Sequence, residues 1–128
     1  MTKTIKEKYQ VEFEIRSSPK ILYNYISNAN GLSEWFADDV NERDGIFSFT
    51  WEGSDAKAKL ISKKENHSIR LHWMEDKDYT YFEMEIVQDG ITGDIALLIT
   101  DFAVKSDQEA GKRLFETQIL NLRQIIGS

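Results

Sequence analysis

The 128 residues contain no cysteine and carry a formal net charge of −6, which excludes a disulfide scaffold and disfavours nucleic acid as a partner. With 41% hydrophobic and 12% aromatic residues the chain is far from the disordered class, so we expect one globular domain over residues 1–128. The first ten residues lack the apolar core of a signal peptide, and Ile95 to Ile99, the longest apolar run of the second half, is too short for a bilayer, so we expect a cytoplasmic protein without membrane insertion.

The predicted elements begin with a strand and two helices. In the segment KYQVEFEIR, residues 8–16, apolar and polar residues alternate, which is the period of a half-buried strand. Ser18 followed by Pro19 predicts the start of a helix, because Ser supplies a capping oxygen and Pro fits the first turn. The segment SNANG ends this helix, and Leu32 to Phe36 predict a second short one.

A meander of strands follows. Turn signals stand at Asp44-Gly45, Gly53, Glu65-Asn66 and Asp89-Gly90. Between them we expect strands at residues 46–51, 56–63, 68–74, 79–88 and 95–104. The last of these is apolar on both faces, so we expect it to lie centrally or to be covered on both sides. Alternation places the large apolar residues of the other strands on one face, at Phe47, Phe49, Trp51, Ile69, Leu71, Trp73, Phe82, Met84 and Ile86.

A long helix from about Gln108 closes the chain. Phe115, Ile119, Leu122 and Ile126 recur at helical spacing and form one apolar stripe. The order of a strand, two helices, several strands and a long helix predicts an α+β fold, with an antiparallel sheet and the helices on one of its faces.

Three segments carry a resemblance to a known family. They are SSPKILYNYISNANGLSEWF, IRLHWMED and ITGDIALLITDFA. They resemble the START-like, helix-grip (SRPBCC) superfamily, and most closely its family of heat-shock chaperone ATPase activators. The resemblance implies a curved antiparallel sheet wrapped around the long C-terminal helix, with two short helices between strands 1 and 2. It also implies an apolar cavity between sheet and helix.

Few residues suggest chemistry. His67 and His72 are the only histidines, and His72 has the parity of the outer sheet face, so no metal site, cofactor or catalytic residue is expected. Phosphate-loop, Ser-nucleophile and dinucleotide motifs are missing from the sequence. Asp38 and Asp39 are adjacent and would point apart in an extended segment, so a solvated acidic turn is favoured over a carboxylate pair.

Asp101 is the more informative carboxylate. It shares parity with Leu97 and Ile99, which places it at or near the space between sheet and helix. A buried carboxylate must find a donor or stay protonated. Two roles stay open for it, a strand-end residue that fixes a neighbouring loop and a polar anchor for a ligand. The candidate donors are the indoles of Trp35, Trp51 and Trp73 and the guanidinium groups of Arg16 and Arg70.

The aromatic residues of the inner face also allow two interpretations. They fill a packed core, or they line an apolar cavity with Trp35 and Phe36 at its mouth. The candidate ligand-binding residues are Trp35, Phe36, Phe49, Trp51, Trp73, Phe82, Met84, Leu97, Ile99, Asp101, Phe115 and Ile119.

Three functions follow from these observations. The favoured one is a non-enzymatic binding domain whose cleft takes a small apolar or amphipathic molecule. The alternative is a protein-interaction module of the chaperone-accessory type, which would use the acidic surface and the Trp35-Phe36 edge to bind a protein partner. An enzyme of the cyclase or hydratase kind, which the resemblance also allows, is less favoured. The identity of the ligand or partner and the oligomeric state stay open.

Overall fold

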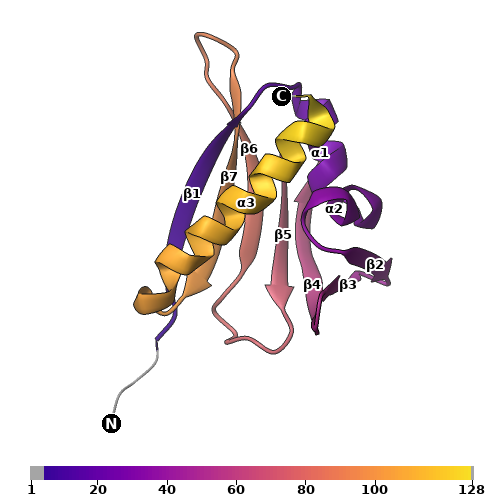
Figure 1. Cartoon of the computed structure of the whole chain (residues 1–128), viewed down its shortest axis with the longest axis vertical. Coiled ribbons are helices and arrows are strands. Elements are labelled where there is room, and N and C mark those ends of the chain that lie inside the picture. Colours follow the sequence, from indigo (N-terminus) through magenta and orange to yellow (C-terminus); the bar gives the residue numbers. More distant parts are fainter. Residues whose placement is uncertain (1–4, 128) are drawn as a thin grey trace.

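The structure, a computed structural model, describes residues 5–127, so the predicted domain ends at residues 1 and 128 lie outside the described part. A curved antiparallel sheet of seven strands is covered on one face by three α-helices (Figure 1). The strands are β1 (Glu7–Ile15), β2 (Asp39–Arg43), β3 (Ile46–Trp51), β4 (Ser54–Lys64), β5 (Ser68–Trp73), β6 (Phe82–Gln88) and β7 (Ile95–Ala103). The helices are α1 (Pro19–Ile26), α2 (Ala29–Trp35) and α3 (Gln108–Ile126), with a 3-10 turn η1 (Lys105–Asp107) before α3.

The sheet order, β1-β7-β6-β5-β4-β3-β2, shows how the chain is wound. Strands β2 to β7 form a continuous meander, while β1 crosses to the far edge and pairs with β7 from Glu7–Ala103 to Ile15–Ile95. This confirms the predicted α+β helix-grip fold, with a long C-terminal helix and two short helices after the first strand. Strand β7 lies inside the sheet, between β1 and β6, and its outer-face residues Ala96, Leu98 and Phe102 are half-buried.

Several elements differ from the predictions. The second helix begins at Ala29 and not at Leu32, and β4 begins at Ser54 and not at residue 56. The predicted acidic turn at Asp38 and Asp39 is wrong for Asp39, which begins the edge strand β2 and pairs with Thr50. The segment DVNER has only Val40 buried, so it lacks the alternation that marks a strand. Strand β6 begins at Phe82 and not at Tyr79, because the backbone N–H of Thr80 turns back to bond the Lys77 carbonyl at 3.1 Å.

Side-chain caps start both short helices. The Ser18 hydroxyl accepts from the Ile21 backbone N–H at 3.2 Å, as the Ser-Pro sequence predicts. The Asn28 side chain accepts from the Gly31 N–H at 2.8 Å and caps the start of α2. Only two residues, Ser27 and Asn28, separate α2 from α1. The two helices meet so closely that a Cβ on Gly31 would collide with the carbonyl oxygen of Asn24 and lie 2.7 Å from the Cα of Tyr25. Glycine is therefore required at this crossing.

The hairpin between β2 and β3 follows its predicted turn chemistry. Asp44 and Gly45 have φ angles of 52° and 80°, which are the left-handed values that a tight two-residue hairpin turn needs. Asn66 adopts a similar φ of 58° in the predicted turn between β4 and β5. These turns fix which face of each following strand meets the helices.

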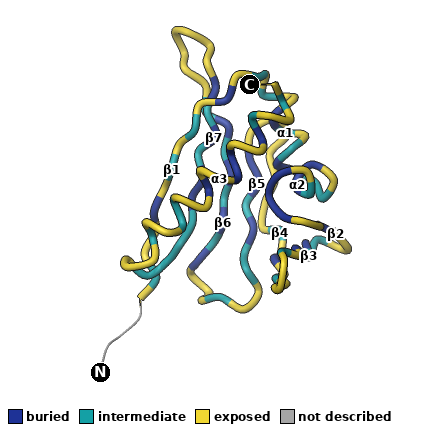
Figure 2. Tube along the Cα trace, in the orientation of Figure 1, coloured by how far each residue is buried: buried dark blue, intermediate teal, exposed yellow. Residues whose placement is uncertain are grey.

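The core lies between the sheet and α3. Figure 2 shows the buried positions recurring along the strands beneath this helix. Phe115, Ile119 and Leu122 of the predicted stripe are buried on α3, and Ile126 is half-buried. Phe36, at the end of α2, is the centre of an aromatic cluster, with ring centroids 5.5 Å from those of Phe49 and Phe82. No helix within residues 5–127 is long and apolar enough to cross a membrane.

Candidate functional site

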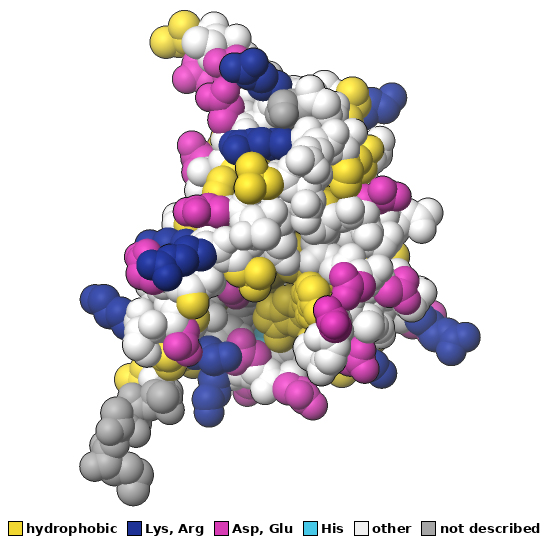
Figure 3. Space-filling view, viewed as in Figure 1, with side chains coloured by type: hydrophobic (Ala, Val, Ile, Leu, Met, Phe, Trp, Pro, Cys, Tyr) yellow, Lys and Arg dark blue, Asp and Glu magenta, His cyan; other side chains and the backbone are white. Residues whose placement is uncertain are grey.

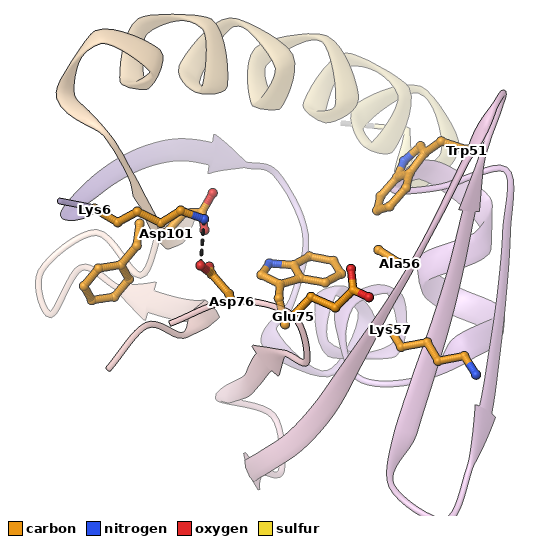
Figure 4. Close-up of a pocket in the computed structure, with 9 residues that line it drawn as sticks. Lys6, Trp51, Ala56, Lys57, Glu75, Asp76 and Asp101 are labelled. Carbon is orange, nitrogen blue, oxygen red and sulfur yellow. Dashed lines mark hydrogen bonds and ion pairs between the residues drawn. The ribbon is translucent and has the colours of Figure 1, made fainter. Parts of the chain in front are cut away.

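A cavity of about 450 Å³ opens at one end of the sheet (Figure 4). Strands β3, β5 and β7 end at this edge and β1 and β4 begin there, because alternate strands of an antiparallel sheet point the same way. The lining residues therefore come from distant parts of the sequence. They are Lys6, Trp51, Ala56, Lys57, Trp73, Glu75, Asp76, Asp101 and Phe102.

Two tryptophans supply the apolar walls. Trp51 ends β3 and Trp73 ends β5, both on the inner face as predicted, and their ring centroids lie 6.3 Å apart. The Trp51 indole N–H donates to the backbone carbonyl of Phe36 at 2.9 Å. This bond uses the only polar group of the Trp51 side chain and holds the ring in place, so the ring offers a ligand only its apolar surface.

Asp101 lies on the same face of β7 as Leu97 and Ile99, as predicted, and it lines the cavity. The hydroxyl of Tyr9 donates to its Oδ2 at 3.3 Å, and the two residues are register partners in the β1–β7 pair. Burial raises the pKa of the Asp101 carboxyl to about 6, although the Phe102 backbone N–H and the Tyr9 hydroxyl favour the charged form. Burial and the neighbouring carboxylate also raise the pKa of Tyr9.

The predicted donors to Asp101 were wrong in three cases. Trp35 donates to the Tyr25 carbonyl at 2.8 Å, Trp51 donates to Phe36, and Arg70 pairs with Glu83 on the outer face. Tyr9, the donor that the structure shows, was missed because it lies 92 residues away in the sequence. The pairing of β1 with β7 brings Tyr9 next to Asp101, and the alternation within one strand does not predict which strand it pairs with.

An ion pair stands beside Asp101. The Lys6 ammonium lies 2.7 Å from Asp76 Oδ1, and Figure 4 shows this pair next to the Asp101 carboxylate on one side of the cavity, with Trp51 on the other. Burial of Asp76 opposes its ionisation, but the Lys6 ammonium and the Lys77 backbone N–H outweigh it and hold the pKa of Asp76 below its usual range. The cavity thus has a polar side and an indole side.

Replacing Asp101 with Asn is expected to stabilise the protein above about pH 6. The pKa of this carboxyl is near 4 in an unfolded chain and about 6 in the folded protein, so the folded state holds the proton more tightly. The wild type keeps this stabilisation below about pH 4 and loses it as the pH rises through 6, a change on the order of 3 kcal/mol. Asn resembles the protonated acid and can still accept from Tyr9.

Urea unfolding of the wild type and Asp101→Asn between pH 4 and pH 8 measures this difference. The free energy of unfolding of Asp101→Asn should increase relative to that of the wild type from about pH 4 to pH 6, and the difference should stay constant above pH 6. A difference that does not change with pH would contradict the assignment, since only a titrating Asp101 separates the two proteins.

The other predicted site residues lie in the packed core. Each of them is at most 6% exposed; they are Phe49, Phe82, Met84, Leu97, Ile99, Phe115 and Ile119. Their rings and chains fill the space under the middle of α3, so the open space is confined to the sheet end. Trp35 and Phe36 are each 4% exposed and border a second hollow, of about 390 Å³, between α2 and α3.

Sequence reasoning found Trp51, Trp73 and Asp101 and missed the charged residues of the cavity. Lys6, Glu75 and Asp76 lie just outside the strands, where hydrophobic alternation gives no signal, and Lys57 is an exposed residue within β4. The histidines lie elsewhere. His72 is on the outer face, as predicted, and its Nδ1 is 2.9 Å from the Thr80 carbonyl oxygen. Within residues 5–127 no three His, Cys, Asp or Glu side chains come close enough to hold a metal ion.

Comparisons with known proteins agree on the fold. A family model described as a START-like superfamily domain matches residues 3–128. The solution structure of BfR322 from Bacteroides fragilis is 33% identical, covers 94% of this chain and 90% of its own, and superposes with a TM-score of 0.65. No curated protein matches the chain.

Two further solved structures are similar in fold alone. The Aha1 dimer from Colwellia psychrerythraea is 14% identical, with coverage of 94% and 96% and a TM-score of 0.76. CalU16 from Micromonospora echinospora is 15% identical, with coverage of 97% and 81% and a TM-score of 0.70. At these identities the likeness concerns the course of the backbone and not the residues of the cavity.

Proposed function

Because the chain belongs to the START-like superfamily, we propose that it is a non-enzymatic binding domain that holds a small amphipathic molecule in the cavity at the end of its sheet. The observation that carries this proposal is the composition of that cavity, in which two tryptophans face a carboxylate and an ion pair. Such a combination of apolar walls with a few convergent polar groups is typical of ligand sites.

The apolar walls would supply the affinity. Burial of apolar surface is favourable by about 25 cal/mol per Å² before the costs of association. Asp101 would orient the ligand, since its side chain reaches the cavity and Tyr9 holds it in place. A cavity of about 450 Å³ is of a size that takes a small organic molecule.

The alternative, a protein-interaction module, has less support from the geometry. It relied on an exposed Trp35-Phe36 edge, and both rings are buried against the core. The TM-score to the Aha1 dimer supports the shared fold and no particular contact surface. We therefore favour the cavity as the functional site.

Filling the cavity is expected to abolish ligand binding. Ala56 is half-buried on the inner face of β4, opposite Phe49, and lines the cavity, so Ala56→Leu would place extra carbon atoms in the space that a ligand needs. Native mass spectrometry of the purified wild type and a thermal-shift panel of lipids, sterols and aromatic compounds would first identify a binder. Its affinity for Ala56→Leu should then fall more than about tenfold.

The matched control is Ala96→Leu, the same change at a half-buried position on the other face of the sheet. It should leave the affinity unchanged. The binding function would be refuted if the purified wild type carries no bound molecule and no compound of the panel changes its melting temperature. Equal binding by the wild type and Ala56→Leu would show that the ligand lies elsewhere.

A further inference from the structure

The opening of the cavity is strongly acidic. The second hollow, between α2 and α3, shares Trp51 with the cavity, and a third of about 400 Å³ shares Ala56, Lys57 and Glu75 with it. The three hollows therefore lie next to one another around the end of β3. The charged residues of this region are six carboxylates and two lysines: Glu34, Asp38, Asp55, Glu75, Asp76, Asp101, Lys6 and Lys57.

Few of these carboxylates are neutralised. Lys6 pairs with Asp76, which leaves Lys57 as the one other lysine of the region. Within residues 5–127 the carboxylates of Glu34, Asp38 and Glu75 take part in no ion pair. Figure 3 shows acidic side chains gathered beside the hydrophobic side chains of the hollow next to α3. The potential at this opening is therefore negative, and an anionic head group would be repelled.

Trp51 offers a second reason for a positive ligand. Its ring lies between the cavity and the second hollow and is half-buried, and its N–H is already bonded to the Phe36 carbonyl. What a ligand can reach is the π surface, which carries partial negative charge. A cation within about 6 Å of a tryptophan face is attracted to the ring, and more strongly where water is excluded.

Gln118 adds an observation independent of the charges. Its side chain lines the second hollow and is 7% exposed, and its Nε2 donates to the Phe36 carbonyl at 2.8 Å. Its Oε1 is buried and accepts no hydrogen bond from residues 5–127. A buried acceptor without a donor destabilises the protein, because it has lost its hydrogen bonds to water. A ligand with an N–H or O–H group in this hollow would supply the missing donor.

We propose that the site selects organic cations, namely amphipathic amines or quaternary ammonium compounds whose charged group rests on Trp51 between the carboxylates of the opening. The body of the ligand occupies the cavity beside Trp73, where Asp101 can contact a polar group on it, and the charged head group lies toward Glu34, Asp38 and Glu75. An amine head can also donate to Gln118, which a quaternary ammonium cannot. This inference rests on the proposed ligand-binding function and adds the charge class of the ligand.

Three compounds with the same 4-phenylbutyl tail test it: 4-phenylbutylammonium, 4-phenylbutanol and 5-phenylpentanoate. Isothermal titration calorimetry with the purified wild type should give the ammonium compound an affinity about tenfold above that of the alcohol. The carboxylate should bind most weakly. Raising the salt concentration from 0.05 to 0.5 M should weaken the ammonium compound and leave the alcohol unchanged, because salt screens only the charged head.

Two variants test which residues cause the preference for the ammonium compound over the alcohol. Trp51→Leu keeps an apolar wall but removes the π surface, and Glu75→Gln removes one charge of the opening. Each should reduce the difference in affinity between the ammonium compound and the alcohol. Glu12→Gln removes the same charge from the exposed outer face of β1 and should leave the difference in affinity between the two compounds unchanged. An equal loss in Glu12→Gln would assign the preference to net charge and overturn the proposed site.

Two negative outcomes are distinguishable. If all three compounds bind with equal affinity and Ala56→Leu weakens them all, the cation preference is wrong while the ligand-binding function stands. If none of the three binds and the wider panel also gives no binder, the ligand-binding function itself fails.

Discussion

Replacing Phe36 with Ala is expected to lower the free energy of unfolding by about 4 kcal/mol, a large part of the stability of a domain of this size. Phe36 is 4% exposed, and its ring touches Trp35, Phe49, Trp51 and Phe82 at centroid distances of 5.5 to 5.7 Å. These neighbours come from α2, β3 and β6 and cannot all close on the space that the ring leaves. The lost contacts and the remaining cavity both destabilise.

Urea unfolding monitored by circular dichroism gives the value. Ile91→Ala is the matched control, since this side chain is 96% exposed in the loop between β6 and β7 and its loss should change stability by no more than about 0.5 kcal/mol. A loss below about 1 kcal/mol for Phe36→Ala would mean that the aromatic cluster is much looser than the ring distances indicate.

Replacing Gly31 with Ala is expected to cost about 3 kcal/mol. In an isolated helix the same change would stabilise, by about 1 kcal/mol, because Ala is the better helix former. Here the added Cβ would meet the backbone of α1 at Asn24 and Tyr25. Backbone atoms cannot rotate away as the end of a side chain can, so α2 would have to move and its packing on the core would be lost.

Gly90→Ala provides the comparison for this prediction. A Cβ on Gly90 would meet nothing within 4 Å, so the change should be nearly neutral. Both variants can be compared by thermal unfolding at neutral pH, where Gly31→Ala should melt many degrees below the wild type. If Gly31→Ala and Gly90→Ala have the same melting temperature, the two short helices do not cross as closely as the structure shows.

The fold could be predicted from the sequence because its signals are local and repeated. The alternation in β1, the Ser18-Pro19 start of α1, the Asp44-Gly45 turn and the stripe of α3 each indicate one element. Strand β2 was missed because an edge strand with one buried residue, Val40, has no period to detect. Tertiary pairing with β3 forms this strand where the local pattern does not.

The candidate site could be predicted only in part. Parity places Trp51, Trp73 and Asp101 on the inner face, and this is a property of each strand alone. The position of α3 decides which inner-face residues are packed and which border open space. Phe82 and Phe115 are buried, whereas Trp51 is only half-buried. The Tyr9 contact to Asp101 and the Lys6–Asp76 pair depend on the sheet order.

The pairing of β1 with β7 also bears on the order of folding. Strand β1 is made before its partner β7, residues 95–103, so it stays unpaired while strands β2 to β6 are synthesised. Contacts that join such distant parts of a chain are slow to form. Because Tyr9 and Asp101 are partners in this last pairing, the carboxylate stays hydrated until the two ends of the chain meet. We therefore expect hydrogen exchange and refolding experiments to find the ligand cavity among the last parts of the protein to form.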